Sequence, residues 1–169
     1  CVQACPVGAL TVKSDLDRVI EALNDSEKVV VVNTAPAVRV ALGEEFGYEP
    51  GSIVTGQMVA ALRKIGFNYV FDTDFAADMT IMEEAHELVG RLTAFLKGEK
   101  ADLPLLTSCC PAWVSFIETQ FPDMLNLPSS AKSPMEMFGA TTKTYFAEKI
   151  GVDAKNIFSV AIMPCTAKK

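Results

Sequence analysis

The sequence predicts an α/β fold in which helices flank a parallel sheet. The first observation is the apolar, β-branched run 29–32, Val-Val-Val-Val, which is typical of a central parallel strand covered on both faces. The second is the alternation of short apolar runs with segments of helical periodicity along the 169 residues, which is typical of βαβ units. The third is that polar or cysteine-containing turns follow the apolar runs, where open sheets place their chemistry.

The composition indicates a folded chain and argues against nucleic-acid and membrane partners. Half of the residues are hydrophobic and 21% are charged, which is enough apolar material to bury a core. The formal net charge is −6 and no long Lys/Arg run offers a surface for phosphates. No apolar run reaches the roughly 18 residues of a membrane span, and no signal peptide opens the chain. Because Cys1 begins the chain and Lys169 ends it just after a cysteine motif, we expect an internal piece of a longer protein.

Five cysteines set the expected chemistry: Cys1, Cys5, Cys109, Cys110 and Cys165. An odd number in a long chain with few cysteines is a poor match to a secreted disulfide scaffold. We therefore expect a reducing, cytoplasmic compartment, with thiols kept for metal binding or catalysis. The chain has a single histidine, His86, which is too few for a zinc site built mainly on imidazole ligands.

The first ten residues match the end of a bacterial ferredoxin motif. Cys1 and Cys5 are separated by three residues and followed by proline, as in the run that ligates 4Fe–4S clusters. The continuation 6–10, Pro-Val-Gly-Ala-Leu, also resembles that motif, and two unrelated thiols in a loop are the alternative. We therefore assign residues 1–12 to the end of a ferredoxin-like 4Fe–4S domain and residues 13–169 to a second domain.

Residues 14–102 are predicted to alternate helices and strands. Helices are expected at 14–24, 38–46, 55–65 and 80–97, and strands at 28–33 and 69–71. The turn 34–37, Thr-Ala-Pro-Ala, joins the first strand to its helix, with Pro36 at the first helical position. Such small side chains let a ligand approach the backbone, and a turn kept small for packing is an equal alternative.

The predicted helix 80–97 carries two rows of side chains. An apolar arc, expected to face the core, consists of Ile81, Ala85, Leu88, Leu92 and Phe95. Glu84, Glu87 and Arg91 form a neighbouring row at spacings of three and four, so that Glu87 and Arg91 can pair. This row is either a solvated flank with an ordinary ion pair or a chain of carboxylates that carries protons.

The adjacent cysteines Cys109 and Cys110 are central to the prediction. They follow an apolar run, 103–106, that we interpret as a buried strand, and they precede Pro111, which begins a predicted helix. A thiol at such a strand-to-helix turn faces the positive end of the helix, which favours the thiolate form.

The last third of the chain is predicted to return to the same sheet edge. A helix is expected at 134–150 and a strand at 157–163, which ends just before Cys165. The chain would then contain at least four parallel strands. Because parallel strands end at one edge of a sheet, we expect Cys109, Cys110 and Cys165 to converge there.

Adjacent cysteines rarely bind one metal, because their side chains usually diverge, so we predict one metal ligand and one free thiol in the pair. Iron–sulfur clusters usually take four cysteine thiolates, and Cys110 and Cys165 would supply two of them. Lys168 and Lys169 add positive charge that would favour an anionic cofactor. The alternatives are small buried hydrophobic residues for the cysteines and a solvated basic pair for the lysines.

Two seven-residue segments resemble the first two motifs of the iron-only (FeFe) hydrogenases. They are 107–113, Thr-Ser-Cys-Cys-Pro-Ala-Trp, and 163–169, Met-Pro-Cys-Thr-Ala-Lys-Lys. The segment 129–134, Ser-Ser-Ala-Lys-Ser-Pro, and the Ala35–Pro36 turn also match. The resemblance implies that residues 13–169 are the truncated first half of an H-cluster domain. It also implies an enzyme that reversibly interconverts dihydrogen with protons and electrons.

The resemblance further implies a cofactor and its ligands. The H-cluster joins a four-iron cubane to a di-iron unit that carries CO, cyanide and a bridging azadithiolate. Cys110 and Cys165 would be cubane ligands, and Cys109 would be the free thiol that exchanges protons with the azadithiolate. Lys168 would hydrogen-bond a cyanide ligand. The di-iron pocket would be lined by Ala35, Pro36 and Met163.

The family's proton path uses two glutamates, a serine and an arginine that lead to the thiol. By alignment of the motifs these are Glu84, Glu87, Ser129 and Arg91, so the resemblance favours a proton relay over a solvated flank. Electrons would pass through accessory 4Fe–4S clusters to ferredoxin or to NAD(P)H-linked subunits.

The side chains at two pocket positions differ from those of many family members, and two alternative functions stay open. Many members have Ser and Gln where this chain has Ala37 and Met135, which suggests a subgroup with NAD(P)H-linked partners. The alternative functions are a non-enzymatic, hydrogenase-like iron–sulfur assembly protein and an H2-sensing hydrogenase. Because those relatives generally lack the proton-exchanging thiol, Cys109 favours the enzyme, although we expect this piece alone to be inactive.

Overall fold

The computed structural model describes residues 4–168, and within them a three-stranded parallel sheet. Its strands are β1 (Val29–Thr34), β2 (Tyr69–Asp72) and β3 (Ile157–Ile162), in the order β2-β1-β3. β1 pairs Val31 with Tyr69 on one side and Val29 with Ile157 on the other. The α/β class and three of the four predicted strands are confirmed. Cys1 lies outside the described residues.

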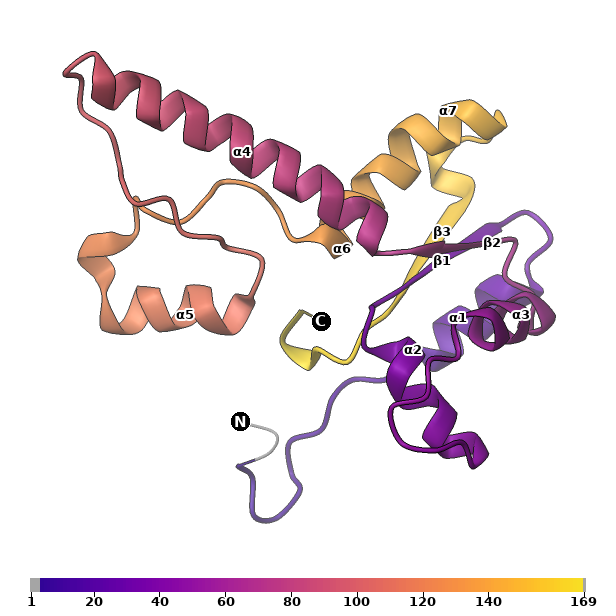
Figure 1. Cartoon of the computed structure of the whole chain (residues 1–169). Helices are drawn as coiled ribbons and strands as arrows, with labels where there is room; N and C mark the ends of the chain where they lie inside the picture. Colours follow the sequence, from indigo (N-terminus) through magenta and orange to yellow (C-terminus); the bar gives the residue numbers. More distant parts are fainter. Residues whose placement is uncertain (1–3, 169) are drawn as a thin grey trace.

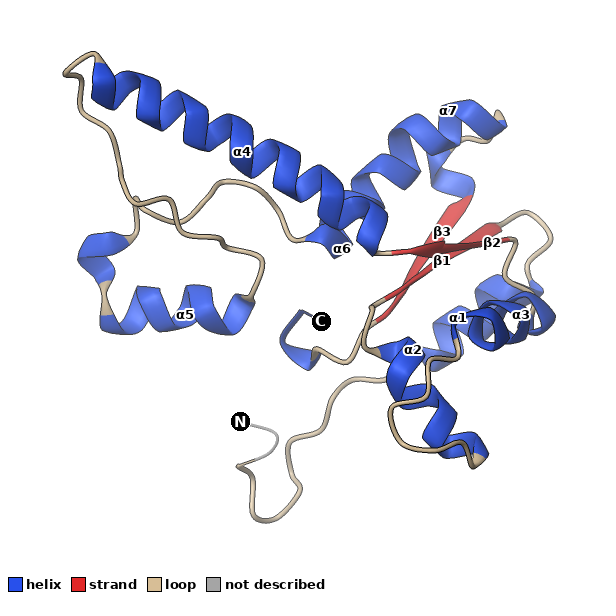
Figure 2. Ribbon diagram, in the orientation of Figure 1, coloured by secondary structure: helices blue, strands red, loops and turns tan. Residues whose placement is uncertain are grey.

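β1 is buried between two layers of helices, which explains its fully apolar sequence. Figures 1 and 2 show α1 (Leu16–Asn24), α2 (Val38–Ala41) and α3 (Thr55–Ile65) on one side of the sheet. On the other side lie α4 (Asp74–Leu96), α6 (Pro134–Thr141) and α7 (Ala147–Ile150).

The side chains of β1 alternate between these two layers. Val30 and Val32 pack in a core cluster with Ala22, Met58, Leu62 and Phe67, which come from α1, α3 and the turn after it. Val31 packs in a second cluster with Ala76, Phe138, Ala147 and Ile157, from α4, α6, α7 and β3. Removing these aliphatic surfaces from water is the main force that holds the sheet and its helices together.

The remaining elements are short. A 3-10 helix, η1 (Leu42–Phe46), continues α2, and α5 (Pro111–Gln120) is followed by η2 (Pro122–Met124). A π-helical stretch, η3 (Thr142–Phe146), joins α6 to α7, while η4 (Ala154–Asn156) and η5 (Thr166–Lys168) flank β3. These boundaries confirm the predicted helices at 38–46, 55–65 and 134–150, and the helix predicted at 14–24 is confirmed with its start at Leu16.

The prediction for the helix 80–97 was wrong in two respects. α4 begins at Asp74, six residues earlier than predicted, and the Asp74 amide donates to Asp72 Oδ1 in the turn that leads into the helix. The apolar arc does not face the core in this chain: Ile81 is 63% exposed and Phe95 is 61% exposed. Instead the row of Glu84, Glu87 and Arg91 is half-buried, because it faces the polypeptide segment around residues 126–130.

The predicted strand 103–106 is also wrong, and the cysteine pair therefore does not follow a strand of the sheet. Leu106 makes an isolated parallel bridge to Pro128, and the sheet is not extended. Pro104 has no amide hydrogen to give to a ladder, which disfavours a strand at this position. Residues 103–130, which we call the cysteine lobe, form a separate unit around α5 that lies beside the far half of α4 (Figure 1).

Within residues 4–168, no helix is long and apolar enough to cross a lipid bilayer.

Candidate functional site

The carboxyl edge of the sheet brings three chain segments together. The Ala35 amide, directly after β1, donates to the carbonyl of Ile162 at 3.0 Å, so Met163 lies close to this turn. The Thr73 amide, directly after β2, donates to the carbonyl of Thr34 at 3.2 Å. Ala35 is 8% exposed, whereas Pro36 is exposed at the turn. Pro36 is not the first helical residue as predicted, since α2 begins at Val38.

The cysteine pair lies at the start of α5, as the Pro111 prediction required. Cys110 is the N-cap residue and Pro111 is the first residue of the helix. Cys109 is half-buried and Cys110 is exposed. The indole Nε1 of Trp113 donates to the carbonyl of Thr107 at 3.0 Å, which folds the residues before the cysteines back onto the helix.

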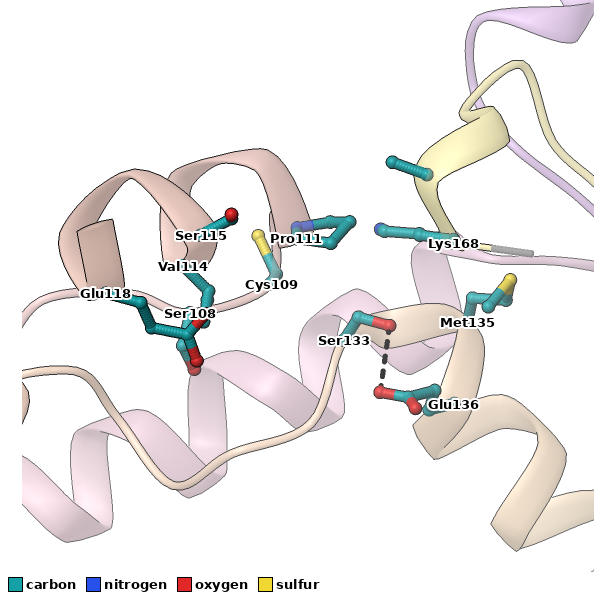
Figure 3. Close-up of a pocket in the computed structure, with 11 residues that line it drawn as sticks. Ser108, Cys109, Pro111, Val114, Ser115, Glu118, Ser133, Met135, Glu136 and Lys168 are labelled. Atoms are coloured by element: carbon teal, nitrogen blue, oxygen red, sulfur yellow. Dashed lines mark hydrogen bonds between the residues drawn. The ribbon is translucent and has the colours of Figure 1, made fainter. Parts of the chain in front are cut away.

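Cys109 lines a pocket of about 430 Å³ between α5, α6 and η5. Figure 3 shows Cys109 beside α5 and the Lys168 amine reaching into the same space from the opposite side. Two carboxylates, Glu118 and Glu136, also line the pocket. The complete lining consists of Ser108, Cys109, Pro111, Val114, Ser115, Glu118, Ser133, Met135, Glu136, Ala167 and Lys168. The thiol therefore faces an open space that also contains a cation.

A second pocket, of about 770 Å³, adjoins the first. Met163 and Cys165 line it, and Met135 and Lys168 line both pockets. The elements α5 and η5 are in contact, so the segments that carry Cys110 and Cys165 are neighbours. The cysteine segments are thus brought together as predicted, but by the packing of α5 on η5 and not by a common sheet edge.

Both carboxylate oxygens of Glu87, one of the predicted relay residues, accept hydrogen bonds. Its Oε1 accepts from Arg91 Nη2 at 2.6 Å, which confirms the predicted pair. Its Oε2 accepts from Ser129 Oγ at 2.7 Å, and from the amide and hydroxyl of Ser130 at 3.1 and 3.3 Å. The pair is largely buried, with side-chain exposures of 20% for Glu87 and 17% for Arg91.

These contacts determine the charge of Glu87. Burial raises the pKa of the carboxyl, but the hydrogen bonds from Ser129, Arg91 and Ser130, together with the charge of Arg91, lower it by more. The net result is a pKa below the ordinary value for glutamate. Glu87 is therefore held as a carboxylate around neutral pH.

Arg91 also makes contacts that the sequence did not indicate. Its Nη1 donates to the carbonyls of Asp102 at 2.8 Å and Leu127 at 3.0 Å, and its Nη2 donates to the carbonyl of Pro128 at 3.2 Å. A guanidinium group with five N–H donors suits such a set of acceptors. Arg91 thus fastens to α4 the residue just before the cysteine lobe and the last part of the lobe, in addition to pairing with Glu87.

Glu84 lies between two contact points of α4. One turn before it, the Thr80 hydroxyl contacts the Met137 sulfur, and one turn after it Glu87 contacts Ser129. Glu84 therefore faces the segment 131–136, which lines the pocket of Cys109 in part. Its Oε1 is buried and has no hydrogen-bond partner among residues 4–168.

Sequence reasoning missed several polar residues around Cys109. The Ser108 hydroxyl donates to the carbonyl of Ser129, and Ser130 adds two contacts to Glu87. Ser133 and Glu136 have the spacing of a capping box, and the hydroxyl of Ser133 lies 3.4 Å from the Glu136 carboxylate (Figure 3). That spacing, and the adjacency of Ser108 to Cys109, were the available signals.

The donor set suits part of an iron–sulfur site. Cys5, Cys109, Cys110 and Cys165 are free thiols, and iron–sulfur clusters take cysteine thiolates. Among residues 4–168, no three His, Cys, Asp or Glu side chains gather in a metal site. The backbone amides of Leu10 and Val7 hold the pKa of the Cys5 thiol below its ordinary value, which favours the ligating form.

Residues 28–169 match the family described as iron only hydrogenase large subunit, C-terminal domain. The NADP-reducing hydrogenase subunit HndD of Solidesulfovibrio fructosivorans is 57% identical over 170 residues, which cover all of this chain and 29% of the relative. A more distant relative, cytosolic iron-sulfur assembly component 3 of Bos taurus, is 34% identical over 88% of this chain and 31% of the relative.

The fold matches that of a solved enzyme. A variant of the FeFe-hydrogenase HydA1 from Chlamydomonas reinhardtii superimposes with a TM-score of 0.84 at 45% identity, over 92% of this chain and 39% of that chain. The chain therefore spans well under half of the length of the proteins that it matches.

Proposed function

This chain belongs to the family of the iron-only hydrogenase large subunit, C-terminal domain, and we propose that it takes part in the reversible conversion of protons and electrons into dihydrogen. The observation that carries the proposal is that the Cys109 thiol and the Lys168 amine line one pocket, and that Cys165 lines the adjoining one. The thiol proposed to carry protons, the lysine amine and the thiol proposed to bind metal thus line two adjoining pockets. This combination supports redox chemistry coupled to proton transfer.

The cofactor implied by the family is the H-cluster, which supplies iron for electron transfer and a bridging amine for proton transfer when bound. Cys110 and Cys165 would hold its cubane, since both are free thiols that directly precede two contacting elements, α5 and η5. Lys168 would donate a charge-assisted hydrogen bond to a cyanide ligand. The wall of the di-iron pocket would be formed by Ala35, Pro36 and Met163.

The proton path would run through residues of this chain. Cys109 would hold a proton at its Sγ and exchange it with a group in the pocket. Ser129 shares its hydroxyl hydrogen with Glu87 Oε2, which gives a hydrogen-bonded step for proton transfer. The buried Oε1 of Glu84, which has no hydrogen-bond partner among residues 4–168, would be a further acceptor on this path. Arg91 would keep Glu87 ionised, so that protonation of Glu87 is transient.

Electrons would arrive through accessory 4Fe–4S clusters, from ferredoxin or an NAD(P)H-linked subunit. The lowered pKa of Cys5 supports a ligand role for this thiol, with Cys1, outside the described residues, as its neighbour in the motif. The name of HndD, an NADP-reducing hydrogenase subunit, supports an NADP-linked partner.

The direct test is Cys109→Ala in the cofactor-loaded enzyme. We expect hydrogen evolution to fall by about 10³-fold or more, since efficient proton transfer to the pocket is lost, while iron content and the infrared bands of CO and cyanide stay unchanged. Thr119→Ala on the same helix removes a 2.8 Å hydrogen bond to the Ser115 carbonyl and serves as the control. Hydrogen evolution by Cys109→Ala at the wild-type rate would refute the role of the thiol.

The second candidate is a non-enzymatic iron–sulfur assembly function, which the 34% identity to the Bos taurus assembly component makes worth testing. By resemblance, such relatives generally lack the thiol at position 109, and so do H2-sensing members. Here Cys109 lines a pocket with Lys168, which supports turnover. A cofactor-loaded protein that transfers iron–sulfur clusters but evolves no hydrogen would favour the second candidate.

A further inference from the structure

We propose that Ser108 is a positioning residue that holds the Cys109 thiol at a fixed distance from the Glu87 carboxylate. Ser108 precedes Cys109 in the chain, is half-buried and lines the same pocket. This inference rests on the proposed function, in which Cys109 and Glu87 belong to one proton path. It adds to that function the residue that sets their relative position.

The Ser108 hydroxyl reaches from the cysteines to a distant segment of the chain. Its Oγ donates to the carbonyl of Ser129 at 2.6 Å and lies 3.2 Å from the carbonyl of Ala131. Because a hydroxyl has one hydrogen to donate, the shorter contact, to Ser129, carries most of the bond. The residue next to the thiol is thereby tied to the segment 129–131.

Ser129 connects the Ser108 hydrogen bond to Glu87 of the proposed proton relay, because the polar atoms of Ser129 have different partners. Its amide donates to the carbonyl of Leu106 at 2.7 Å, and its carbonyl accepts from Ser108. Its hydroxyl donates to Glu87 at 2.7 Å and accepts from the Ala131 amide at 3.0 Å. Ser129 is only 6% exposed, so these bonds are shielded from water. One buried residue therefore links the cysteine segment to the carboxylate.

The hydrogen bond of Ser108 matters because the cysteine pair does not follow a strand of the sheet. The backbone bridge between Leu106 and Pro128 ends two residues before Ser108. Beyond it, the Ser108 hydroxyl and the bond from Trp113 to Thr107 hold the segment that leads to Cys109. The Trp113 bond fixes this segment to its own helix, whereas the Ser108 bond fixes it to the segment that carries Ser129.

Loss of the hydroxyl should therefore displace the thiol without removing any reacting group. A misplacement of about 1 Å can cost on the order of 10²-fold in rate when reacting groups must align. For Ser108→Ala in the cofactor-loaded enzyme we expect kcat for hydrogen evolution, per loaded cofactor, to fall by roughly 10- to 100-fold. The KM for the electron donor should stay unchanged, because Ser108 is half-buried and its substitution by alanine leaves the charge of the protein surface unchanged.

Two further variants separate positioning from a general loss of stability. Ser108→Thr keeps the hydroxyl and should restore most of the rate. Ser52→Ala removes a hydroxyl-to-carbonyl hydrogen bond of the same length, 2.6 Å to Glu49, at an exposed turn outside the site. It should leave kcat at the wild-type value.

A second measurement does not depend on hydrogenase activity. In the cofactor-free protein, the rate of iodoacetamide alkylation at Cys109 is followed by peptide mass spectrometry. Ser108→Ala should raise this rate several-fold, because the thiol moves more freely, while Ser108→Thr and Ser52→Ala should not. If alkylation responds but the loaded wild-type protein evolves no hydrogen, the proposed function fails and the positioning role stands. An alkylation rate in Ser108→Ala equal to that of the wild-type protein would overturn the proposal, whether or not kcat per cofactor also stays at the wild-type value.

Discussion

The sheet and the cysteine lobe are held together by different forces. In the sheet, Val31 and Val32 have no exposed surface and pack against helices on both sides. In the cysteine lobe, the large side chains Trp113 and Phe116 remain 37% and 47% exposed, and Arg91 and serine hydroxyls supply the long-range ties. The site thus combines a wall fixed by apolar burial with a thiol fixed by a few polar contacts. Small polar substitutions in the lobe should therefore affect the site more than they affect the fold.

The largest expected effect is on the stability of the apolar core around the sheet. Ile157→Ala removes a side chain that is 1% exposed and packs with Val31, Ala76 and Phe138. The free energy of unfolding, measured with urea, should fall by about 3–4 kcal/mol, since a cavity forms in the core. The matched control is Ile65→Ala at a position that is 60% exposed, which should cost less than about 0.5 kcal/mol. Equal losses in the two variants would contradict the assignment of the core.

Arg91→Met should loosen the lobe and leave the sheet intact. The change removes hydrogen bonds to the main-chain carbonyls of Asp102, Asn126, Leu127 and Pro128. It also removes the partner of the Glu87 carboxylate, and the total cost should be about 2–3 kcal/mol. Amide hydrogen exchange should therefore become faster in peptides covering 102–108 and 126–130, with little change in 29–34. Arg63→Met, at an exposed position in the last turn of α3, should change neither region. Faster exchange in the sheet to the same extent would mean that the two regions unfold together.

A smaller effect is expected from the charge of Glu87. Because the folded-state pKa is lowered, ionised Glu87 contributes stability that is fully present above its unfolded pKa of about 4.5 and is lost as pH falls through the lower folded value. Glu87→Gln should therefore flatten the dependence of unfolding free energy on pH in the range below about 4.5. The exposed neighbour Glu83→Gln on the same helix should leave the curve unchanged. A wild-type slope in Glu87→Gln would show that the carboxylate is not stabilised in the fold.

The sequence predicted the sheet better than the lobe for a physical reason. The valine run 29–32 and the strand 157–162 are defined by local pattern, because burial on both faces requires consecutive apolar residues. The lobe depends on contacts between Arg91 and main-chain carbonyls, and every residue has a carbonyl, so no side-chain pattern marks them. The apolar run 103–106 therefore looked like a strand although its partner is a single bridge to Pro128.

The candidate site was predictable where chemistry is carried by rare side chains. Spacing alone gave the Glu87–Arg91 pair, and Pro111 marked the helix start beside the cysteines. The family resemblance placed Ser129 and Glu87 in one proton path. Local spacing could not indicate their contact, because the two residues are 42 positions apart in the chain. The ties made by Ser108 and Ser130 were not predicted, because serine is common and its partners are set by the tertiary fold.

The central claim is that two cysteines hold the cofactor while a third, adjacent one stays free to carry protons. Differential alkylation of the loaded and cofactor-free protein, read by peptide mass spectrometry, tests it directly. The account predicts that loading protects Cys110 and Cys165 from iodoacetamide and leaves Cys109 reactive. Protection of Cys109 with Cys110 left reactive, or full reactivity of Cys165 in the loaded protein, would contradict it.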